Sequence, residues 1–389
     1  MDYNKMALEM HKRLAGKIAI KSKIEVKNET DLSIAYTPGV AEPCREIHKN
    51  EATVYDYTSK SNLIAVVSDG SAVLGLGNIG AKASIPVMEG KCVLFKEFAN
   101  VDAFPICLET NDVDEIVRTV KLIEPVFGGI NLEDISAPRC FEIERKLKEI
   151  MDIPVFHDDQ HGTAVVCAAA IINSLKLAGK KFEDSTVVIN GSGAAGNSIA
   201  KLLLNLGIKD ILMCDRKGII SRNRENLDKY KKELAEITNK GNLNGTLQDA
   251  MKNTDVFIGV SAPGLVTKEM VASMNDKAIV FPMANPEPEI MPDLAKEAGA
   301  FIVGTGRSDF PNQVNNVLAF PGIFRGTLDV RASDINEAMK MAAAKALAEA
   351  VGDDLNVNHI LPKPFSKGYT EKIIDAVKKA AIESGLARI

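Results

Sequence analysis

The sequence predicts an α/β protein with two domains, each built on a mainly parallel β-sheet. The chain has 389 residues, which is more than one hydrophobic core usually organises. From residue 63 onward, strand-like and helix-like segments alternate, and this order is typical of parallel sheets. Each half of the chain also carries a glycine-rich segment after an apolar, strand-like one. We expect the two domains at residues 1–160 and 161–389.

The composition is that of an ordinary globular protein. A formal net charge of −5 gives no general field that would attract nucleic acid or an acidic membrane. The six cysteines include no CxxC pair, which indicates reduced thiols packed in cores. The start, MDYNKMALEMHKR, lacks the apolar core of a signal peptide, and no apolar run reaches the roughly 18 residues that span a bilayer. We therefore expect a cytoplasmic protein.

The N-terminal region combines a helix with a turn-rich segment. Residues 1–28 show helical spacing followed by a polar linker. In DLSIAYTPGVAEPC (31–44), Pro38 and Gly39 should end any regular element just after Tyr36. A tyrosine hydroxyl on such a stiff turn can serve as an acid, and the alternative is a packed aromatic with a satisfied hydroxyl.

The first glycine-rich segment, GLGNIG (75–80), follows the strand-like LIAVVSDG and matches GxGxxG literally. A dinucleotide fingerprint needs an uninterrupted helix after its last glycine, so that the helix N-terminus faces the pyrophosphate. Here Pro86 and Gly90 follow within ten residues. We therefore predict that this segment is not the dinucleotide turn.

Four carboxylates follow two neighbouring strands of the predicted first sheet. Residues 101–150 alternate strand, helix, strand (126–130) and helix, and another strand (153–156) precedes a long apolar helix at about 163–177. Glu133 and Asp134 come after one strand, and Asp158 and Asp159 after the next. Because the carboxyl ends of parallel strands share one edge, these side chains should converge there as oxygen ligands for Mg²⁺ or Mn²⁺. The alternative is a solvated acidic turn that caps the helix. The helix itself is apolar nearly all round and should be buried between the domains.

The second glycine-rich segment lies between a strand-like segment and an uninterrupted helix, and the first segment lacks such a helix. The strand-like STVVIN leads into GSGAAG, whose residues are Gly191, Ser192, Gly193, Ala194, Ala195 and Gly196. An unbroken helix and a second strand follow, and this strand ends at Asp215. The pattern predicts a Rossmann-type, doubly wound domain that binds a dinucleotide, with Asp215 at the ribose 2′-hydroxyl. Asp215 favours NAD because a carboxylate repels a 2′-phosphate, whereas Arg216 and Lys217 could hold that phosphate of NADP.

Further along, loops with asparagines follow other strands of this domain. Strands are expected at 255–260, 278–283 and 301–304, and two helices at about 333–351 and after LPKPF. Asn285, in ANPEPE, and Asn315 with Asn316 should face the crevice between the domains. Their amides could bind a small polar ligand, although an asparagine before proline is commonly a turn former.

Taken together, several motifs resemble the malic enzymes, specifically the short bacterial branch. They are AYTPGVAEPC, VVSDGSAVLGLGNIG, IPVMEGKCVLFK, NLEDIS, FHDDQHGTA, INGSGAAG, MANPEPE, NNVLAFPG and LPKPF. They occur in matching order from about residue 10 to the end. The phosphotransacetylase-like extension of some bacterial members has no counterpart in this sequence.

The resemblance implies oxidative decarboxylation of L-malate to pyruvate and CO₂ with reduction of NAD or NADP, assisted by Mg²⁺ or Mn²⁺. It implies Lys91 as general base and Tyr36 as general acid, and Asn285 and Asn315 as malate contacts. The metal carboxylates that it implies are Glu133, Asp134 and Asp159, with Asp158 beside them. It also implies a homodimer. A malolactic-type enzyme that retains NAD and releases lactate, or a non-catalytic nucleotide sensor, is the alternative.

Three features of the sequence bear on the site residues that the resemblance implies. Longer members carry an arginine where this chain has Ala72, so the group that holds the C4 carboxylate of malate is open. Lys96 competes with Lys91, and a catalytic lysine needs a pKa well below about 10.4. His157 and His161 suggest zinc by their spacing, but the HExxH pattern is absent.

Overall fold

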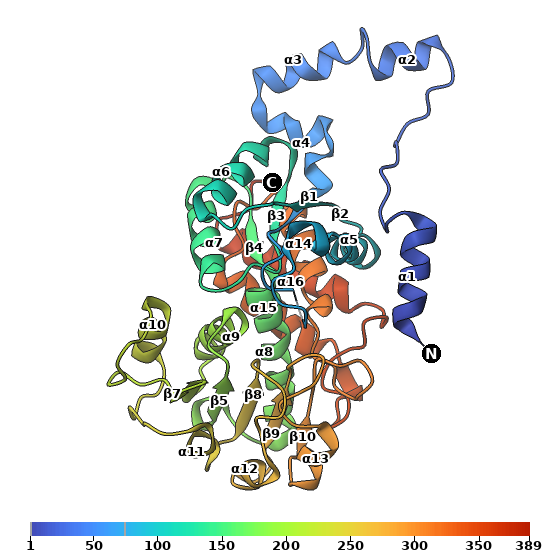
Figure 1. Cartoon of the computed structure of the whole chain (residues 1–389). Helices are drawn as coiled ribbons and strands as arrows, with labels where there is room; N and C mark the ends of the chain where they lie inside the picture. The colour runs from blue at the N-terminus through green and yellow to red at the C-terminus, as the bar shows by residue number, and fades with distance from the viewer. Residues whose placement is uncertain (1, 74) are drawn as a thin grey trace.

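Two sheets lie one above the other in the computed structural model, which describes residues 2–73 and 75–389, with α8 (Asp158–Ala178) between them (Figure 1). The first sheet has the strand order β2-β1-β3-β4 and is parallel. The second has the order β10-β9-β8-β5-β6-β7 and is parallel except for the pairing of β6 with β7. The strand order of the second sheet reverses at β5, as in a doubly wound fold. The predicted α/β class and Rossmann-type domain are thus confirmed.

From residue 63 on, the N-terminal half follows the predicted alternation, whereas the helices within residues 29–57 were not predicted. Its elements, in chain order, are α1 (Tyr3–Leu14), α2 (Glu29–Ala35), α3 (Ala41–Lys49), α4 (Val54–Tyr57), β1 (Leu63–Ser68), α5 (Gly80–Ala99), β2 (Asp102–Cys107), α6 (Val113–Ile123), β3 (Gly129–Leu132), α7 (Arg139–Ile150) and β4 (Val155–His157). Helix α8 begins at Asp158, five residues before the predicted start, so both aspartates of this segment lie in its first turn.

The C-terminal half adds elements that the sequence pattern did not reveal. They are the short antiparallel strand β7 and the helices α10 to α14. In order, the half consists of β5 (Thr186–Asn190), α9 (Ala194–Asn205), β6 (Asp210–Asp215), β7 (Gly218–Ile219), α10 (Lys229–Ile237), α11 (Leu247–Met251), β8 (Val256–Gly259), α12 (Lys268–Ala272), β9 (Ile279–Pro282), α13 (Pro292–Glu297), β10 (Ile302–Val303), α14 (Phe320–Asp329), α15 (Glu337–Glu349) and α16 (Tyr369–Glu383).

One apolar core extends across both sheets. It includes Ile64 of β1 and Val187 of β5, with Ala168 and its neighbours on α8 between them. The helix is long and apolar enough to cross a membrane by length and composition alone, but 72% of its most apolar window is buried inside the protein. It is therefore a core helix, as its apolar circumference predicted. The proposed boundary at residue 160 falls within its first turn, and the domain division remains a prediction.

The expected interruption after GLGNIG is wrong. Helix α5 runs from Gly80 to Ala99 straight through Pro86 and Gly90. Pro86 lies on the exposed side of the helix, so water can hydrate the carbonyl oxygen of Lys82 that loses its hydrogen bond. The glycines nevertheless do not form a tight strand-to-helix turn, because residues 69–79 separate β1 from α5. A side chain at Gly77 or Gly80 would meet nothing within 4 Å.

The cysteine prediction is only partly right. Cys92, Cys140, Cys167 and Cys214 are buried thiols, but Cys44 on α3 is exposed. The exposure reflects the position of the N-terminal arm, residues 2–57, whose helices α1 to α3 stand away from the body of the protein (Figure 1). None of these three helices contains a buried residue.

Candidate active site

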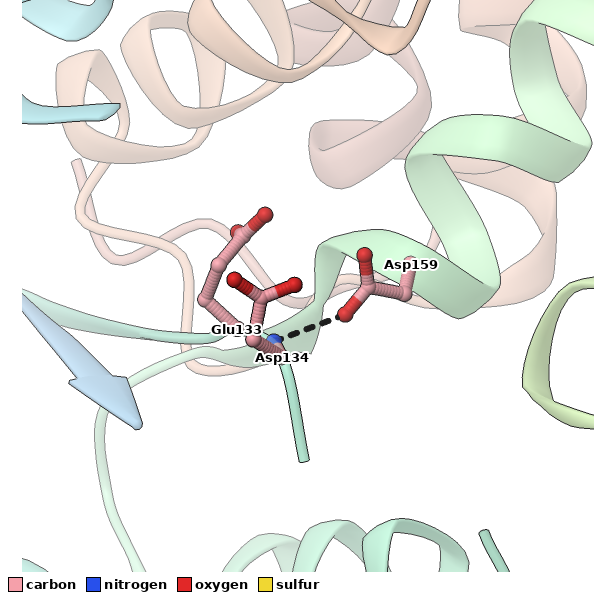
Figure 2. A group of neighbouring side chains, drawn as sticks. All are labelled: Glu133, Asp134 and Asp159. Carbon is pink, nitrogen blue, oxygen red and sulfur yellow. Dashed lines mark hydrogen bonds between the residues drawn. The ribbon is translucent and has the colours of Figure 1, made fainter. Parts of the chain in front are cut away.

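The edge of the first sheet brings three carboxylates together. Glu133 and Asp134 follow β3, and Asp159 lies in the first turn of α8, so two neighbouring strand ends supply the group (Figure 2). One oxygen from each residue lies within 4.8 Å of the others. The backbone N–H of Asp134 donates to Asp159 Oδ2 at 2.8 Å, and this bond holds the loop after β3 against the first turn of α8.

This group of like charges is electrostatically strained. Burial and the neighbouring carboxylate of Asp159 raise the pKa of Asp134 to about 7. Burial also raises the pKa of Glu133 well above its ordinary value, although Lys91 opposes the effect. Asp134 has a left-handed backbone with φ of +53°, and its buried Oδ2 has no hydrogen-bond partner among the residues that the structure describes. A divalent cation would satisfy that oxygen and neutralise the group, so the residues fit such an ion.

The fourth predicted metal ligand, Asp158, points elsewhere. Its Oδ2 accepts hydrogen bonds at 2.5 Å from Lys91 Nζ and from Asn316 Nδ2. Gly162, one turn along α8, makes this orientation possible, because a Cβ there would lie 1.8 Å from Asp158 Oδ1. Asp158 therefore serves the lysine in this structure, and the carboxylate group consists of the other three.

Lys91 is buried at the centre of these charges. Its Nζ lies 3.0 Å from Glu133 Oε1 and 3.9 Å from the centre of the Phe320 ring. Burial lowers the pKa of Lys91, but the charges of Asp158 and Glu133 outweigh it, and the pKa is raised. The expectation of a lowered pKa is thus wrong for the metal-free chain, because two carboxylates face the ammonium. Lys96, the competing lysine, pairs with Asp102 on the surface at 2.9 Å.

Two residues beside Lys91 come from α14 and the turn before it. Asn316 shares Asp158 with the lysine, and the ring of Phe320 covers the ammonium. The motif NNVLAFPG contained both residues, but the sequence offered no signal that α14 packs against α5. The sequence pattern placed Asn316 at the crevice together with Asn315, but it assigned no role to Phe320 and did not pair Asn316 with Asp158.

The remaining predicted residues around the carboxylates have other partners. Asn315 accepts from the backbone N–H of Val317 at 3.0 Å, and Asn285 Nδ2 lies 3.5 Å from the Met283 carbonyl oxygen. The backbone N–H of Ala72 donates to the Asp134 carbonyl oxygen at 2.9 Å, so the loop that lacks the arginine borders the carboxylates. Tyr36 is 68% exposed on the N-terminal arm, at the end of α2.

Both histidines near the site lie outside the carboxylate group. His161 bonds with Glu144 at 2.8 Å and with Lys340 at 3.2 Å. His157 is fully buried, and neither of its ring nitrogens has a hydrogen-bond partner in the described chain. The only groups of potential metal ligands among the described residues contain carboxylates alone.

The second glycine-rich segment forms a tight turn between β5 and α9. Gly191 has φ of +122°, and a Cβ there would lie 2.4 Å from the Val260 carbonyl oxygen. A Cβ at Gly196 would lie 1.8 Å from the Gly191 carbonyl oxygen. The turn borders a hollow of about 1010 Å³ that Gly191, Ser192, Asp215 and Lys231 help to line. This cradle, at the N-terminus of α9, fits the pyrophosphate of a dinucleotide.

The turn between β5 and α9 also contacts the half of the chain that carries the first sheet. Ala194 packs against the apolar cluster that contains Ile135, the residue directly after Asp134. Ser198 on α9 donates to Gln160 beside Asp159 at 3.5 Å. These contacts place the turn and the carboxylates at one junction.

Asp215 is already paired at the mouth of the hollow. Arg224 Nη2 lies 2.7 and 2.6 Å from its two oxygens, and Lys231 Nζ lies 3.0 Å from Oδ2. Burial raises the pKa of Asp215, but these bonds and the backbone N–H of Lys217 outweigh it and lower the pKa. A phosphate on the ribose would therefore meet Asp215 together with the positive charges of Arg224 and Lys231.

Comparison with known proteins identifies the family. Residues 15–148 match the malic enzyme N-terminal domain, and residues 160–382 match the malic enzyme NAD binding domain. The chain belongs to the malic enzyme family. It is 60% identical over 391 residues to the bifunctional malic/malolactic enzyme of Bacillus subtilis strain 168, covering 100% of this chain and 95% of that protein. It is 57% identical to the NAD-dependent malic enzyme of Geobacillus stearothermophilus, covering 96% and 78%.

Solved malic enzymes share the fold. The NAD-dependent malic enzyme of Thermotoga maritima superposes with a TM-score of 0.93 at 51% identity, covering 96% of this chain and 98% of that one. The malic enzyme of Pyrococcus horikoshii gives a TM-score of 0.96 at 47% identity, covering 99% and 92%. This malic enzyme is a decarboxylating oxidoreductase, and both NAD- and NADP-dependent enzymes are among its relatives.

Proposed function

We propose that this malic enzyme oxidatively decarboxylates L-malate to pyruvate and CO₂, with a divalent cation held by Glu133, Asp134 and Asp159. The observation that carries the proposal is the meeting of these three carboxylates, two of them buried and Asp159 half-buried, beside Lys91. A bound Mg²⁺ or Mn²⁺ supplies Lewis-acid chemistry at the C2 hydroxyl and C1 carboxylate of malate.

The chain's own groups move the protons. In its neutral form Lys91 takes the C2 hydroxyl proton, and Asp158 and Asn316 orient its Nζ for this step. A cation held by Glu133 would offset part of the negative charge beside Lys91 and would so favour the neutral amine that this step needs. Asn285 and Asn315 hold malate by their amides, and Tyr36 donates a proton to C3 after CO₂ leaves.

A second copy of the chain brings Tyr36 to the site. Within one chain, Leu32, Ile34 and Tyr36 are 53%, 70% and 68% exposed on an arm that stands away from the body. A homodimer that buries this arm would remove apolar surface from water and complete the proton path.

Mixing inactive variants tests this arrangement. Tyr36→Phe and Lys91→Ala chains, mixed after unfolding and refolding together, form heterodimers in which one site has both residues if Tyr36 acts across the interface. Random pairing then restores roughly one quarter of wild-type activity. No restored activity in a mixture whose heterodimers are verified by mass would contradict the exchange.

We also propose NAD as the preferred cofactor, which accepts the hydride. The retained Asp215 supports it, as does the NAD-dependent relative at 57% identity. Because Arg224 and Lys231 offset the charge of Asp215, NADP should be accepted at a higher KM.

Initial rates test the proposal directly. Malate is supplied with NAD or NADP, with and without Mn²⁺, while reduced cofactor, pyruvate and lactate are measured. We expect pyruvate and reduced cofactor in equal amounts, and activity only with the metal. Lactate without net reduction would replace the proposal with the malolactic reaction. Absence of turnover with both cofactors would contradict it.

A further inference from the structure

Glu289, in the loop between β9 and α13, holds a carboxylate that is completely buried. A buried carboxylate is costly unless hydrogen bonds replace the water that it loses. Its described hydrogen-bond partners are neutral donors. Oε1 accepts from the backbone N–H and the hydroxyl of Ser261 at 2.9 and 3.0 Å. Oε2 accepts from the backbone N–H of Ala284 at 3.0 Å.

The two oxygens reach two different loops. Ser261 follows β8 and lines the dinucleotide hollow, where its hydroxyl also accepts from Asn190 Nδ2 at 2.8 Å. Ala284 follows β9 and directly precedes Asn285, the asparagine assigned to malate. The carboxylate thus joins the wall of the dinucleotide hollow to the malate loop.

The neighbouring backbone leaves room for this group. A Cβ at Gly259, on β8, would lie 2.3 Å from Glu289 Cδ, a distance at which something must move. The backbone N–H of Val266 also donates to the Glu289 carbonyl oxygen at 3.0 Å. The position of the carboxylate is therefore set from several sides.

We propose that Glu289 is a positioning residue that fixes the malate loop, and Asn285 with it, relative to the bound dinucleotide. The inference rests on the proposed function, in which Asn285 contacts malate. It assigns Glu289 no contact with substrate and no proton transfer. Its role is to hold the two substrates in register, because small displacements of reacting groups slow catalysis strongly.

The donors around residue 289 explain why this position carries a carboxylate, because they face both of its oxygens. Both oxygens of Glu289 must accept, whereas the amide of a glutamine has one accepting oxygen. In Glu289→Gln, the least costly orientation keeps the oxygen on Ser261, which offers two donors. The amide nitrogen then faces the N–H of Ala284 and repels it. The substitution should release the malate loop and leave the dinucleotide side intact.

Glu289→Gln should therefore weaken the use of malate without weakening the binding of the dinucleotide. We expect the KM for malate to rise at least tenfold, while the dissociation constant of the reduced dinucleotide, followed by its fluorescence, changes less than twofold. The chain contains no tryptophan, so that signal has little protein background. Glu287→Gln is the matched control, because Glu287 lies exposed in the same loop, and it should change neither value.

Ser261→Ala provides the opposite test and serves if Glu289→Gln fails to fold. It removes one hydroxyl between Asn190 and Glu289, and it should weaken dinucleotide binding by several-fold with little change in the KM for malate. Asn173→Ala, which removes two hydrogen bonds between α8 and the C-terminal region, should lower the melting temperature without changing either constant.

The inference is overturned if Glu289→Gln leaves the KM for malate unchanged or alters both constants equally. The same holds if Ser261→Ala raises only the KM for malate. A wild-type protein that binds the dinucleotide but does not turn over malate would instead overturn the proposed function.

Discussion

Neutralising one carboxylate of the proposed metal site should stabilise this enzyme in the absence of metal. Asp134 is the clearest choice, because its side chain makes no described hydrogen bond that Asp134→Asn would remove. Asparagine also tolerates the left-handed backbone at this position. The substitution removes a buried charge that Asp159 and Glu133 repel, so the metal-free folded state should gain free energy.

The pKa of Asp134 sets the size and sign of the effect. In an unfolded chain this carboxyl has a pKa of about 3.9, against about 7 in the folded chain. The folded chain therefore binds a proton that the unfolded chain has lost between about pH 4 and pH 7, and its stability falls as the pH rises through that range. The difference of about 3 in pKa corresponds to about 4 kcal/mol above pH 7 and to less than half of that at pH 5.

Thermal unfolding of the metal-free protein measures this gain. For 389 residues, an unfolding entropy of about 0.8 kcal/mol per degree converts about 4 kcal/mol into about 5 °C. We expect Asp134→Asn to melt up to about 5 °C higher at pH 8, with a smaller gain at pH 5. Mn²⁺ should raise the melting temperature of the wild type and not that of the variant.

The control is Asp375→Asn, which removes the same charge from an exposed position on α16. It should leave the melting temperature nearly unchanged at both pH values. A variant at Asp134 that is no more stable than the metal-free wild type at pH 8, or whose gain is the same at pH 5, would refute the reasoning.

Three further predictions follow from the site and the second sheet. Lys91→Ala and Asp159→Ala should each abolish malate turnover in a steady-state assay while the dissociation constant of the reduced dinucleotide stays within about threefold, because both residues lie outside the glycine turn. Lys231→Ala should raise the KM for NADP at least tenfold and the KM for NAD less than threefold. The reason is that a charge-assisted hydrogen bond from Lys231 to the 2′-phosphate of NADP contributes about 1.5–3 kcal/mol. Equal increases in the two KM values would contradict a contact between Lys231 and the 2′-phosphate. Asp255→Asn should destabilise the protein at pH 7, because Lys180 and the Thr186 N–H hold the folded pKa of Asp255 below its ordinary value despite burial. Its stability advantage is present above the unfolded pKa of about 3.9 and is lost as the pH falls through the lower folded pKa, so urea midpoints of wild type and variant should converge in acid.

The parts of the fold that local pattern could predict are those set by neighbours in the chain. Gly191 and Gly196 are required because the backbone of Val260 and of Gly191, respectively, lies too close for a side chain. The GxGxxG motif predicts both of these glycines. The meeting of Glu133 with Asp159 follows from parallel strand order alone, because adjacent carboxyl ends share one edge.

Contacts between distant segments could not be predicted in this way. Asn316 reaches Asp158 across 158 positions of sequence, and α14 carries Phe320 over Lys91. Arg224 covers Asp215 only because the chain after β6 folds back. The local penalty of a proline predicts the wrong end for helix α5, where an exposed position and tertiary packing of the other face outweigh about 3 kcal/mol of lost helix stability.

The central claim is that one divalent cation is bound by three carboxylates at the junction with the dinucleotide turn. A crystal structure of the enzyme with Mn²⁺ and reduced dinucleotide, with anomalous scattering measured for manganese, tests it most directly. We predict a single manganese peak at about 2.1–2.3 Å from oxygens of Glu133, Asp134 and Asp159, on the side that faces the nicotinamide. A manganese peak away from these residues, or a dinucleotide bound on the opposite side of the protein, would contradict the account.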